Sequence, residues 1–411
     1  MKREITLFLP CANGCEAFLA DEVQRITGRV AEIGRGGVWV GGDERTAMQL
    51  NLECRIAQRV LWPLADGPYF STEDLYALGR RVPWGDWITP QQTLRVDVVA
   101  MKSPLQSLNF AALRIKDAVC DTLREATGER PSVDTRHPDL PIALFVGPEH
   151  AMLYVDTSGD ALFKRGWRED TGEAPLKETL AAAMLAAIGW QGRPEDGPLL
   201  DPCCGAGTLA IEAAQMACGI AAGSLRRFAF ENMLPFRAFL PAWRELQQAA
   251  RDRVHAPAVP VFAGDVSFRM TDFAHRNARR AGVEHAIELK TMDALQRPAP
   301  VPSGTIVMNP PYGERMGAKG TGSSTETEAS REAFEGGGSS AEFFGGLAAH
   351  WKRHYAGWTA WLLTPDMKLP GLMRLKESRR VPLRNGAIDC RLFRFDMVAG
   401  SNKPPAREET A

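Results

Sequence analysis

The sequence predicts an α/β protein in which a doubly wound parallel sheet, ending in an antiparallel hairpin, follows two smaller α+β units. Strand-like runs alternate with helical patterns through residues 161–400, and this alternation is typical of a parallel sheet covered by helices. A glycine-rich turn follows the first of these strands and opens a helix. Near the end of the chain, Asn385-Gly386 separates two strand-like runs, which is a strong hairpin signal.

Two units of alternating strands and helices precede the larger one, so we expect three domains, at residues 1–65, 66–160 and 161–400. The first should contain a strand, a helix, a second strand and a second helix, at 5–10, 15–26, 37–42 and 46–60. The second should contain a strand at 93–100, a helix at 110–126 and a hairpin formed by 143–147 and 151–158.

The third unit carries five strand patterns with helical patterns between them. The strands are expected at 199–203, 259–265, 287–293, 305–310 and 358–365, and the helices at 175–188, 207–218, 267–281 and 342–355. Pro382 cannot donate to a sheet ladder, so the first arm of the final hairpin should lie at the sheet edge. The polar segment 320–340 should be a flexible loop and residues 401–411 a disordered tail.

Composition restricts the class of protein. The formal net charge of −1 neither favours nor excludes nucleic acid as a partner. Segment 351–394 is locally basic, and it could meet phosphate or simply form a solvated face. The eight cysteines lack zinc-like spacing, and the N-terminus carries neither a membrane span nor a signal peptide. We therefore expect reduced thiols, no metal, no membrane association and a cytoplasmic location.

The glycine-rich turn runs from Asp201 through Cys203, Gly205 and Gly207 to Thr208. Its glycines allow a sharp turn and a close approach of the backbone to a ligand. The following helix presents free N–H groups at its N-terminus. The turn alone is weak evidence, because it also fits the looser dinucleotide pattern, and a nicotinamide enzyme stays an alternative.

Two acidic residues end the next strands of this unit. Asp265 ends the second strand and could accept hydrogen bonds from ribose hydroxyls. Asp293 ends the third strand and could accept from an adenine amine. Each could instead cap the following helix, but two such acids behind a glycine turn favour an adenosine ligand. Residues 219–258 separate the turn from the second strand and must form an excursion.

The motif Asn309-Pro310-Pro311-Tyr312 stops the fourth strand abruptly, at the strand end where α/β sheets bind ligands. Asn309 offers an amide oxygen, Pro310 a carbonyl and Tyr312 an aromatic face, a set that suits a flat ring with an exocyclic amine. Methylation of an aromatic amine would use such a clamp, whereas hydride transfer would not. A structural proline turn is the alternative, and the motif does not choose between adenine and guanine.

Four segments together carry a resemblance to a known family. DPCCGAGTLAIEAA, GDVSFRMTDFAHRNARRAGV, MNPPYGERMG and FKRGWREDTGEAPLKETLAAAML resemble the class I S-adenosylmethionine-dependent RNA methyltransferases with an N-terminal THUMP domain. Within these the chain is similar to the bacterial 23S rRNA guanine-N2 methyltransferases, in their short form with one methyltransferase domain. The resemblance implies a Rossmann-like methyltransferase domain after a ferredoxin-like unit and a THUMP module.

The resemblance also implies roles for individual residues. Asn309, Pro310, Pro311 and Tyr312 would hold the target base. The S-adenosyl-L-methionine site would consist of Asp201, Cys203, Gly205, Gly207, Thr208, Asp265, Val266, Asp293, Ala294 and Asn309, closed at its methionine end by Lys177 and Thr179. Lys164, Arg165, Arg168 and Arg315 would contact RNA. The first three could instead fix the angle between domains or belong to a solvated linker.

The resemblance leaves alternatives open. Transfer RNA could be the substrate instead of 23S rRNA, and adenine N6 could be the target instead of guanine N2. No obligate protein partner is implied. Two departures bear on the site: Ala206 stands where the family often has serine, and the 320–340 insert is longer than expected, which leaves the substrate-side loop undefined.

Overall fold

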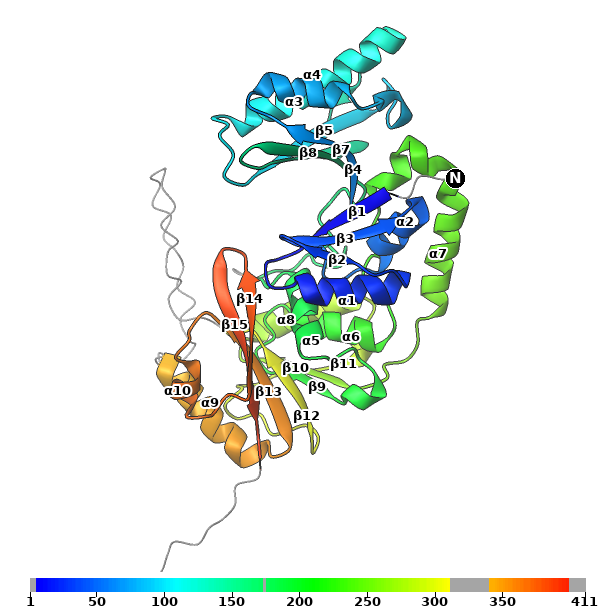
Figure 1. The fold of residues 1–411 in the computed structure, drawn as a ribbon. Coiled ribbons are helices and arrows are strands. Elements are labelled where there is room, and N and C mark those ends of the chain that lie inside the picture. Colours follow the sequence, from blue (N-terminus) through cyan, green and yellow to red (C-terminus); the bar gives the residue numbers. More distant parts are fainter. Residues whose placement is uncertain (1–4, 173–174, 311–339, 399–411) are drawn as a thin grey trace, which may run out of the picture. The chain divides into compact units, whose positions relative to one another are not determined.

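The computed structural model describes residues 5–172, 175–310 and 340–398 (Figure 1). The chain divides into two compact units. The N-terminal unit comprises Met1–Arg168, Lys177–Ala183 and Gly219–His255. The C-terminal unit comprises Glu169–Leu176, Met184–Cys218 and Ala256–Ala411.

The N-terminal unit is built on one eight-stranded sheet with the order β2-β3-β1-β4-β8-β7-β5-β6. Its strands are β1 (Ile5–Pro10), β2 (Glu32–Gly34), β3 (Gly37–Gly42), β4 (Leu61–Pro68), β5 (Thr93–Ala100), β6 (Ser132–Val133), β7 (Leu140–Val146) and β8 (His150–Asp156). The expected hairpin of β7 and β8 is confirmed. Strand β4 was not expected, because its sequence LWPLADGP holds two prolines and a glycine. It pairs with both β1 and β8 and joins the two halves of the sheet.

Four helices of this unit are α1 (Glu16–Thr27), α2 (Glu44–Glu53), α3 (Thr72–Arg80) and α4 (Leu108–Thr127). The expectation that the second helix reaches residue 60 is wrong. The buried carboxylate of Glu22 accepts from the Cys54 thiol at 2.9 Å and from the N–H groups of Arg55 and Ile56 at 3.0 Å. Those backbone donors point to Glu22 and not to a preceding turn, so the helix ends at Glu53.

The excursion after the glycine turn is built into the N-terminal unit. Its helix α7 (Leu240–Asp252) contacts α2, and its aromatic side chains Phe230 and Trp243 are buried. The N–H groups of Gly223 and Phe230 donate to the carbonyls of Leu52 and Thr157. Removing residues 1–160 would therefore expose the apolar surface of the excursion. Loss of activity in such a truncated protein would not distinguish a loss of RNA binding from a loss of stability.

Arg226 holds the chain that follows β8. Its guanidinium donates to four backbone carbonyls, those of Ser158, Asp160, Ala161 and Lys164, at 2.7–3.2 Å. We expect Arg226→Ala to lower the free energy of unfolding by about 2–4 kcal/mol, because these acceptors lose their donor. Urea unfolding measures this effect. The neighbouring exposed Arg227 gives the matched control, and an Arg227→Ala variant of equal instability would contradict the assignment.

The C-terminal unit contains a seven-stranded sheet with the order β11-β10-β9-β12-β13-β15-β14. Its parallel strands are β9 (Leu199–Asp201), β10 (Val261–Asp265), β11 (Ile287–Thr291), β12 (Gly304–Met308) and β13 (Trp358–Thr364). The antiparallel hairpin of β14 (Arg379–Asn385) and β15 (Ile388–Asp396) completes it. This arrangement confirms the expected fold class, and Pro382 lies in the edge strand as expected.

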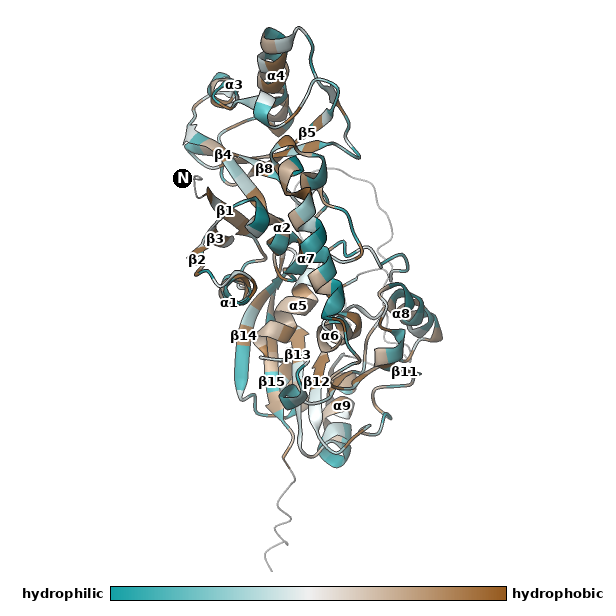
Figure 2. Ribbon diagram, turned by 90° about the vertical axis from the view of Figure 1, so that its right-hand side faces the viewer, coloured by the Kyte–Doolittle hydropathy of each residue, from teal (hydrophilic) through white to brown (hydrophobic). Residues whose placement is uncertain are grey.

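Helices cover both faces of this sheet. They are α6 (Thr208–Ala217), α8 (Phe268–Arg280), α9 (Ser340–His354) and α10 (Leu369–Met373). Helix α5 (Glu178–Ala187) begins in the N-terminal unit and ends in the C-terminal unit. Phe262 packs in the core cluster of α9, whereas its neighbour Ala263 faces α6 and α8, as alternation along a strand requires. Strands β12 and β13 are mostly hydrophobic, as expected for strands covered on both faces (Figure 2).

Candidate active site

The strand order of the C-terminal unit reverses at β9, which lies between β10 and β12. Register places Asp201 opposite Ala263 of β10, and Leu200 opposite Ile306 of β12. The ends of these three strands therefore meet at one edge of the sheet. Ligands of open α/β sheets bind at such a reversal, outside the carboxyl ends of the strands.

The turn after β9 depends on glycine at two positions. Gly205 has φ 51° and Gly207 has φ 88°, in the left-handed region that other residues rarely adopt. A Cβ on Gly207 would also lie 3.0 Å from Cβ of Ala274 on α8, so a side chain there would push the two helices apart. The Cys204 N–H donates to the carbonyl of Gly264 at 2.8 Å, which fixes the turn to β10.

Asp265 ties this turn to the end of β10. One carboxylate oxygen accepts from the N–H of Gly205 at 3.0 Å, and the other accepts from the N–H of Ser267 at 3.0 Å. Asp265 is partly exposed, and the following Val266 is 51% exposed. Two residues sixty positions apart in the chain thus meet, and the acid lies beside the turn where a ribose could reach it.

Asp293 lies two residues beyond the end of β11. Its carboxylate accepts from the N–H of Leu295 at 2.8 Å, and its carbonyl accepts from the N–H groups of Gln296 and Arg297. No helix begins directly after it in the described part of this loop, so it closes a turn and does not cap a helix. Ala294 beside it is buried.

Asp201 and Arg297 are two buried titratable residues near the turn. Asp201 is 3% exposed, and burial, with a smaller effect of the nearby Asp265 charge, raises its pKa to about 8. Arg297 is also 3% exposed and donates to the carbonyl of Ala263 at 2.6 Å. Its positive charge acts to lower the pKa of Asp201. Arg297 could not be predicted as a buried residue from the sequence, because a basic residue in a turn is usually solvated.

The raised pKa of Asp201 has a consequence for stability. Protonation favours the folded state, so this contribution is complete below about pH 4 and is lost as pH rises towards 8. We expect Asp201→Asn to remove part of that pH dependence, by up to about 1.4 kcal/mol per pH unit. Denaturant unfolding of the ligand-free protein across this pH range measures it. Equal slopes for wild type and variant would show that Asp201 ionises normally.

Asn309 and Pro310 follow directly on β12. Asn309 is partly exposed and Pro310 is buried. Pro311, Tyr312, Arg315 and nearly all of the 320–340 insert lie outside the described residues. The carbonyl and amide side of the predicted base clamp is therefore located at the sheet edge, whereas its aromatic side stays a prediction.

The other predicted cofactor residues, Lys177 and Thr179, belong to the N-terminal unit. The Lys177 ammonium lies 5.0 Å from the ring centre of Phe163, and Thr179 is largely buried. Between them, the buried carboxylate of Glu178 accepts from Nε of Arg168 at 2.7 Å. Their place at the methionine end of a cofactor stays a prediction.

The predicted RNA contacts near residue 165 differ in exposure. Lys164 is exposed and pairs with Asp160 at 2.8 Å. Arg168 is mostly buried, paired with Glu178 and stacked over Trp167. Arg165 requires a correction, because its side chain is 1% exposed and donates to the carbonyls of Leu162 and Arg55. It holds two segments of the N-terminal unit together and is inaccessible to RNA, whereas a role in fixing the angle between domains stays a prediction.

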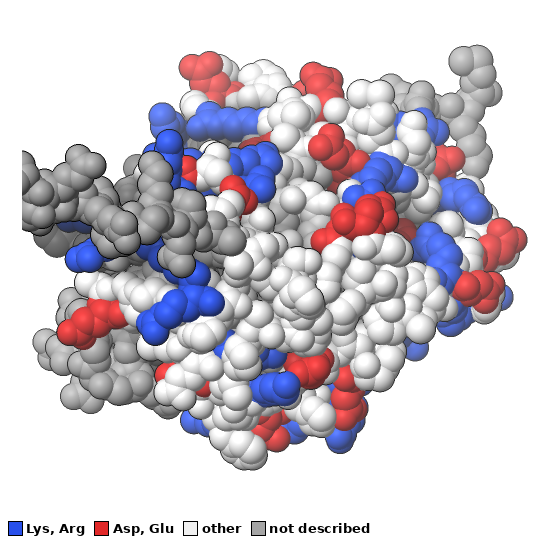
Figure 3. All heavy atoms as spheres, turned by 90° about the horizontal axis from the view of Figure 1, so that it is seen from below, with Lys and Arg blue, Asp and Glu red and all other residues white. Residues whose placement is uncertain are grey.

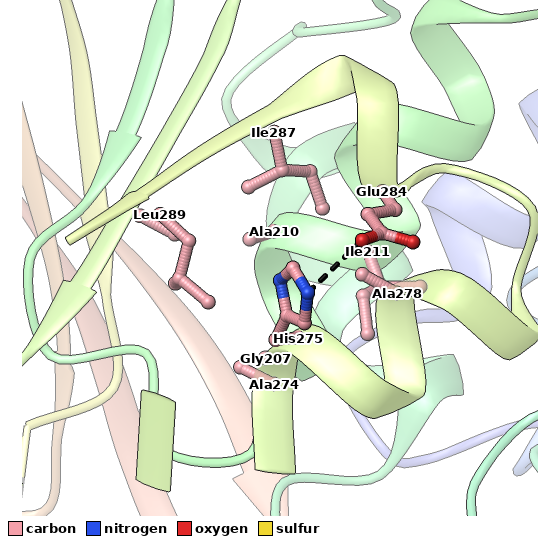
Figure 4. Close-up of a pocket in the computed structure, with 10 residues that line it drawn as sticks. Gly207, Ala210, Ile211, Ala274, His275, Ala278, Glu284, Ile287 and Leu289 are labelled. Atoms are coloured by element: carbon pink, nitrogen blue, oxygen red, sulfur yellow. Dashed lines mark ion pairs between the residues drawn. The ribbon is translucent and has the colours of Figure 1, made fainter. Parts of the chain in front are cut away.

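One cavity in the described part of the chain lies between α6, α8, β10 and β11, with Gly207 of the glycine turn among its lining residues (Figure 4). His275 and Glu284 form an ion pair of 2.9 Å in its wall, and the other lining residues are mostly apolar. Its volume of about 10 Å³ would hold at most one water molecule. It is therefore too small to hold a nucleotide.

The surface charges and the arrangement of metal-ligating side chains do not indicate a further site in the described residues. Acidic and basic side chains are interspersed on the face that Figure 3 presents. Within residues 5–172, 175–310 and 340–398, no cluster of three or more His, Cys, Asp or Glu side chains could hold a metal ion. None of the helices described has the length and apolar character needed to cross a membrane.

Comparison with known proteins agrees with this geometry. Residues 165–394 match the RMKL-like methyltransferase domain, residues 69–156 the THUMP domain and residues 6–61 the RlmL ferredoxin-like domain. The ribosomal RNA large subunit methyltransferase K/L of Syntrophotalea carbinolica is 35% identical over 99% of this chain. The alignment covers 56% of that relative, and the chain spans about half the length of the curated relatives it matches.

Two solved structures share the fold over nearly the whole chain. SMU.472, in complex with S-adenosylhomocysteine (SAH), superposes with a TM-score of 0.81 at 26% identity, over 96% of this chain and 99% of its own. A Listeria monocytogenes protein named as a predicted N6-adenine-specific DNA methylase superposes with a TM-score of 0.80 at 25% identity, over 96% of both chains. With more than half of its length matched by one family, the chain belongs to the RMKL-like methyltransferases, with RlmL ferredoxin-like and THUMP domains preceding the methyltransferase domain.

Proposed function

We propose that this chain is an S-adenosyl-L-methionine-dependent RNA methyltransferase that modifies the exocyclic N2 amine of a guanine in 23S rRNA. The observation that carries the proposal is the meeting of the glycine turn, Asp265 and Asn309 at the point where the sheet order reverses. The curated relatives are named as large subunit rRNA methyltransferases, and a THUMP domain suits an RNA substrate.

The residues around the turn fit the proposed cofactor. The left-handed Gly205 leaves open space where a side chain would stand, since a Cβ there meets no atom within 4 Å. Asp265 could accept from the ribose hydroxyls and Asp293 from the adenine amine, while Ala294 and Val266 offer apolar surface to the base. When bound, S-adenosyl-L-methionine supplies an electrophilic methyl group. A structural neighbour binds the product form, SAH.

The proposed mechanism rests on positioning by Asn309 and Pro310. Their oxygens accept the two N–H bonds of the guanine amine and turn its lone pair out of conjugation with the ring. S-adenosyl-L-methionine would supply its methyl group to the nitrogen that these residues hold, with SAH as the leaving group, and the alkylated amine would release a proton to solvent water. No general base is needed before transfer, so most of the rate gain comes from orientation. Tyr312 would stack on the base.

A second target, adenine N6, has one observation in its favour. The same pair of acceptors would hold an adenine amine, and the Listeria neighbour is named for that reaction on DNA. Transfer RNA is a second substrate to consider, because a THUMP domain specifies RNA and not a particular RNA. Incubation with labelled S-adenosyl-L-methionine and either 23S rRNA or tRNA, followed by nucleoside analysis, separates these candidates.

Calorimetry tests the cofactor independently of the RNA. We expect S-adenosyl-L-methionine and SAH to bind and NAD to show no heat of binding. Binding of NAD without binding of S-adenosyl-L-methionine would contradict the proposal and favour a nicotinamide-dependent enzyme.

A further inference from the structure

The hairpin of β14 and β15 reaches past the carboxyl end of β13. The candidate site lies at the carboxyl ends of the same parallel strands. Thr364, the last residue of β13, pairs with Arg391, and Arg391 pairs with Pro382. Three more residues of each hairpin arm continue beyond that level, which is roughly 10 Å. Figure 1 shows this hairpin extending beyond the ends of its neighbours.

Register also relates this hairpin to Asn309. Met308 pairs with Leu362, and Leu362 pairs with Phe393. Pro310 lies two residues beyond the end of β12, and Arg391 lies two residues from Phe393 on β15, in the same direction. Only β13 separates β12 from β15. Neighbouring strands lie about 4.8 Å apart, so β12 and β15 are roughly 10 Å apart. A nucleotide next to a base held at Asn309 would reach that far.

Three cations of the described residues lie on the hairpin and in the loop after β13. Arg391 is half-buried, donates to the Cys390 carbonyl at 2.8 Å and forms no ion pair within the described residues. Lys368 is exposed in the loop after β13, and its ammonium has no acidic partner there. Arg384, near the hairpin turn, pairs with Asp389 at 2.8 Å, with both side chains at least 40% exposed. Such a surface pair is weak and can exchange for a phosphate.

Protection of the outer strand β14 against aggregation does not explain all three cations. Arginines and Pro382 on β14 would by themselves block sheet-to-sheet aggregation. Arg391, however, belongs to β15, which is paired on both sides, and Lys368 belongs to a loop. Two carboxylates lie beside these cations among the described residues, and each is already engaged: Asp389 with Arg384, and Asp366 with the N–H of Lys368. The exposed apolar side chains Met367 and Ile388 lie in the same loop and hairpin.

We propose that Lys368, Arg384 and Arg391 form a phosphate-binding rim that holds the RNA strand flanking the target base. Met367 and Ile388 would give an unstacked neighbouring base an apolar surface. This inference rests on the proposed function and adds to it: it assigns an RNA contact to the methyltransferase unit, separate from the THUMP domain. It also favours phosphate contact over a solvated face as the explanation for the basic segment 351–394.

The test measures RNA binding over a series of salt concentrations, with wild type and a triple variant, Lys368→Gln, Arg384→Gln and Arg391→Gln. Loss of three phosphate contacts on a single strand should reduce the slope of log K against log salt by about 2. The KM for RNA should rise at least tenfold. The turnover number at saturating RNA and the Kd for S-adenosyl-L-methionine should stay near wild type.

Arg353→Gln is the matched control. Arg353 is exposed in the last turn of α9, which precedes β13 and so lies at the opposite edge of the sheet. If the triple variant has the same KM for RNA and the same salt dependence as Arg353→Gln, the proposed phosphate-binding rim is wrong. If the triple variant unfolds, single Lys368→Gln in the exposed loop should still reduce the slope by about 0.7. A wild-type protein that methylates no RNA would instead contradict the proposed function.

Discussion

Replacing Asn309 with alanine is expected to reduce the turnover number for methyl transfer by roughly a hundredfold to a thousandfold. The Kd for S-adenosyl-L-methionine should change little. The reason is that the Asn309 amide oxygen is proposed to bind the amine of the base, and its hydrogen bond matters most as the nitrogen becomes alkylated. Single-turnover transfer of a labelled methyl group to 23S rRNA, with calorimetry of the cofactor, measures both quantities.

Asn309→Asp provides the matched comparison, because a carboxylate keeps an acceptor where alanine has none. It should retain clearly more activity than Asn309→Ala. Because Asn309 directly follows β12, thermal unfolding of both variants must also show an intact fold. Undiminished turnover in Asn309→Ala would rule out the amine clamp, and equal losses of activity in both variants would rule out the amide oxygen as its acceptor.

Replacing Asp265 with alanine is expected to weaken S-adenosyl-L-methionine binding about a hundredfold or more. Two hydrogen bonds from ribose hydroxyls to a charged group would be lost, each contributing about 1.5–3 kcal/mol. The variant also loses the contacts of this carboxylate with the N–H groups of Gly205 and Ser267, so the glycine turn should loosen. Calorimetry gives the change in affinity and thermal unfolding the change in stability.

Asp272→Ala is the control for this substitution. Asp272 lies on the surface of α8, close in sequence to Asp265, and its 47% exposed side chain pairs with Arg276. This variant should bind the cofactor like wild type. If Asp265→Ala binds it equally well, the ribose lies elsewhere and the adenosine site has been misplaced.

The sequence predicted those parts of the fold that local chemistry decides. Pro382 limits its strand to an edge, and Asn385-Gly386 fixes the hairpin turn, so both features could be foreseen. Asp265 could also be placed beside the glycine turn, because a parallel sheet brings its strand ends to one edge. In each of these cases the residue type and its place relative to a predicted strand were enough to predict the feature.

Tertiary contacts decided what the sequence could not show. Strand β4 forms in spite of two prolines because it is bordered by β1 and β8. Glu22 ends α2 from thirty residues away, and Arg297 is buried with no local pattern to mark it. The sequence predicted an excursion at 219–258 but not that residues 219–255 belong to the N-terminal unit, where Phe230 and Trp243 are buried.

Mass spectrometry of nucleosides from 23S rRNA, prepared from cells with and without this protein, tests the central claim most directly. We expect one N2-methylguanosine to disappear without the protein, to return with the wild-type gene and to stay absent with Asn309→Ala. Unchanged N2-methylguanosine, or loss of N6-methyladenosine in its place, would contradict guanine-N2 methylation of 23S rRNA by this site.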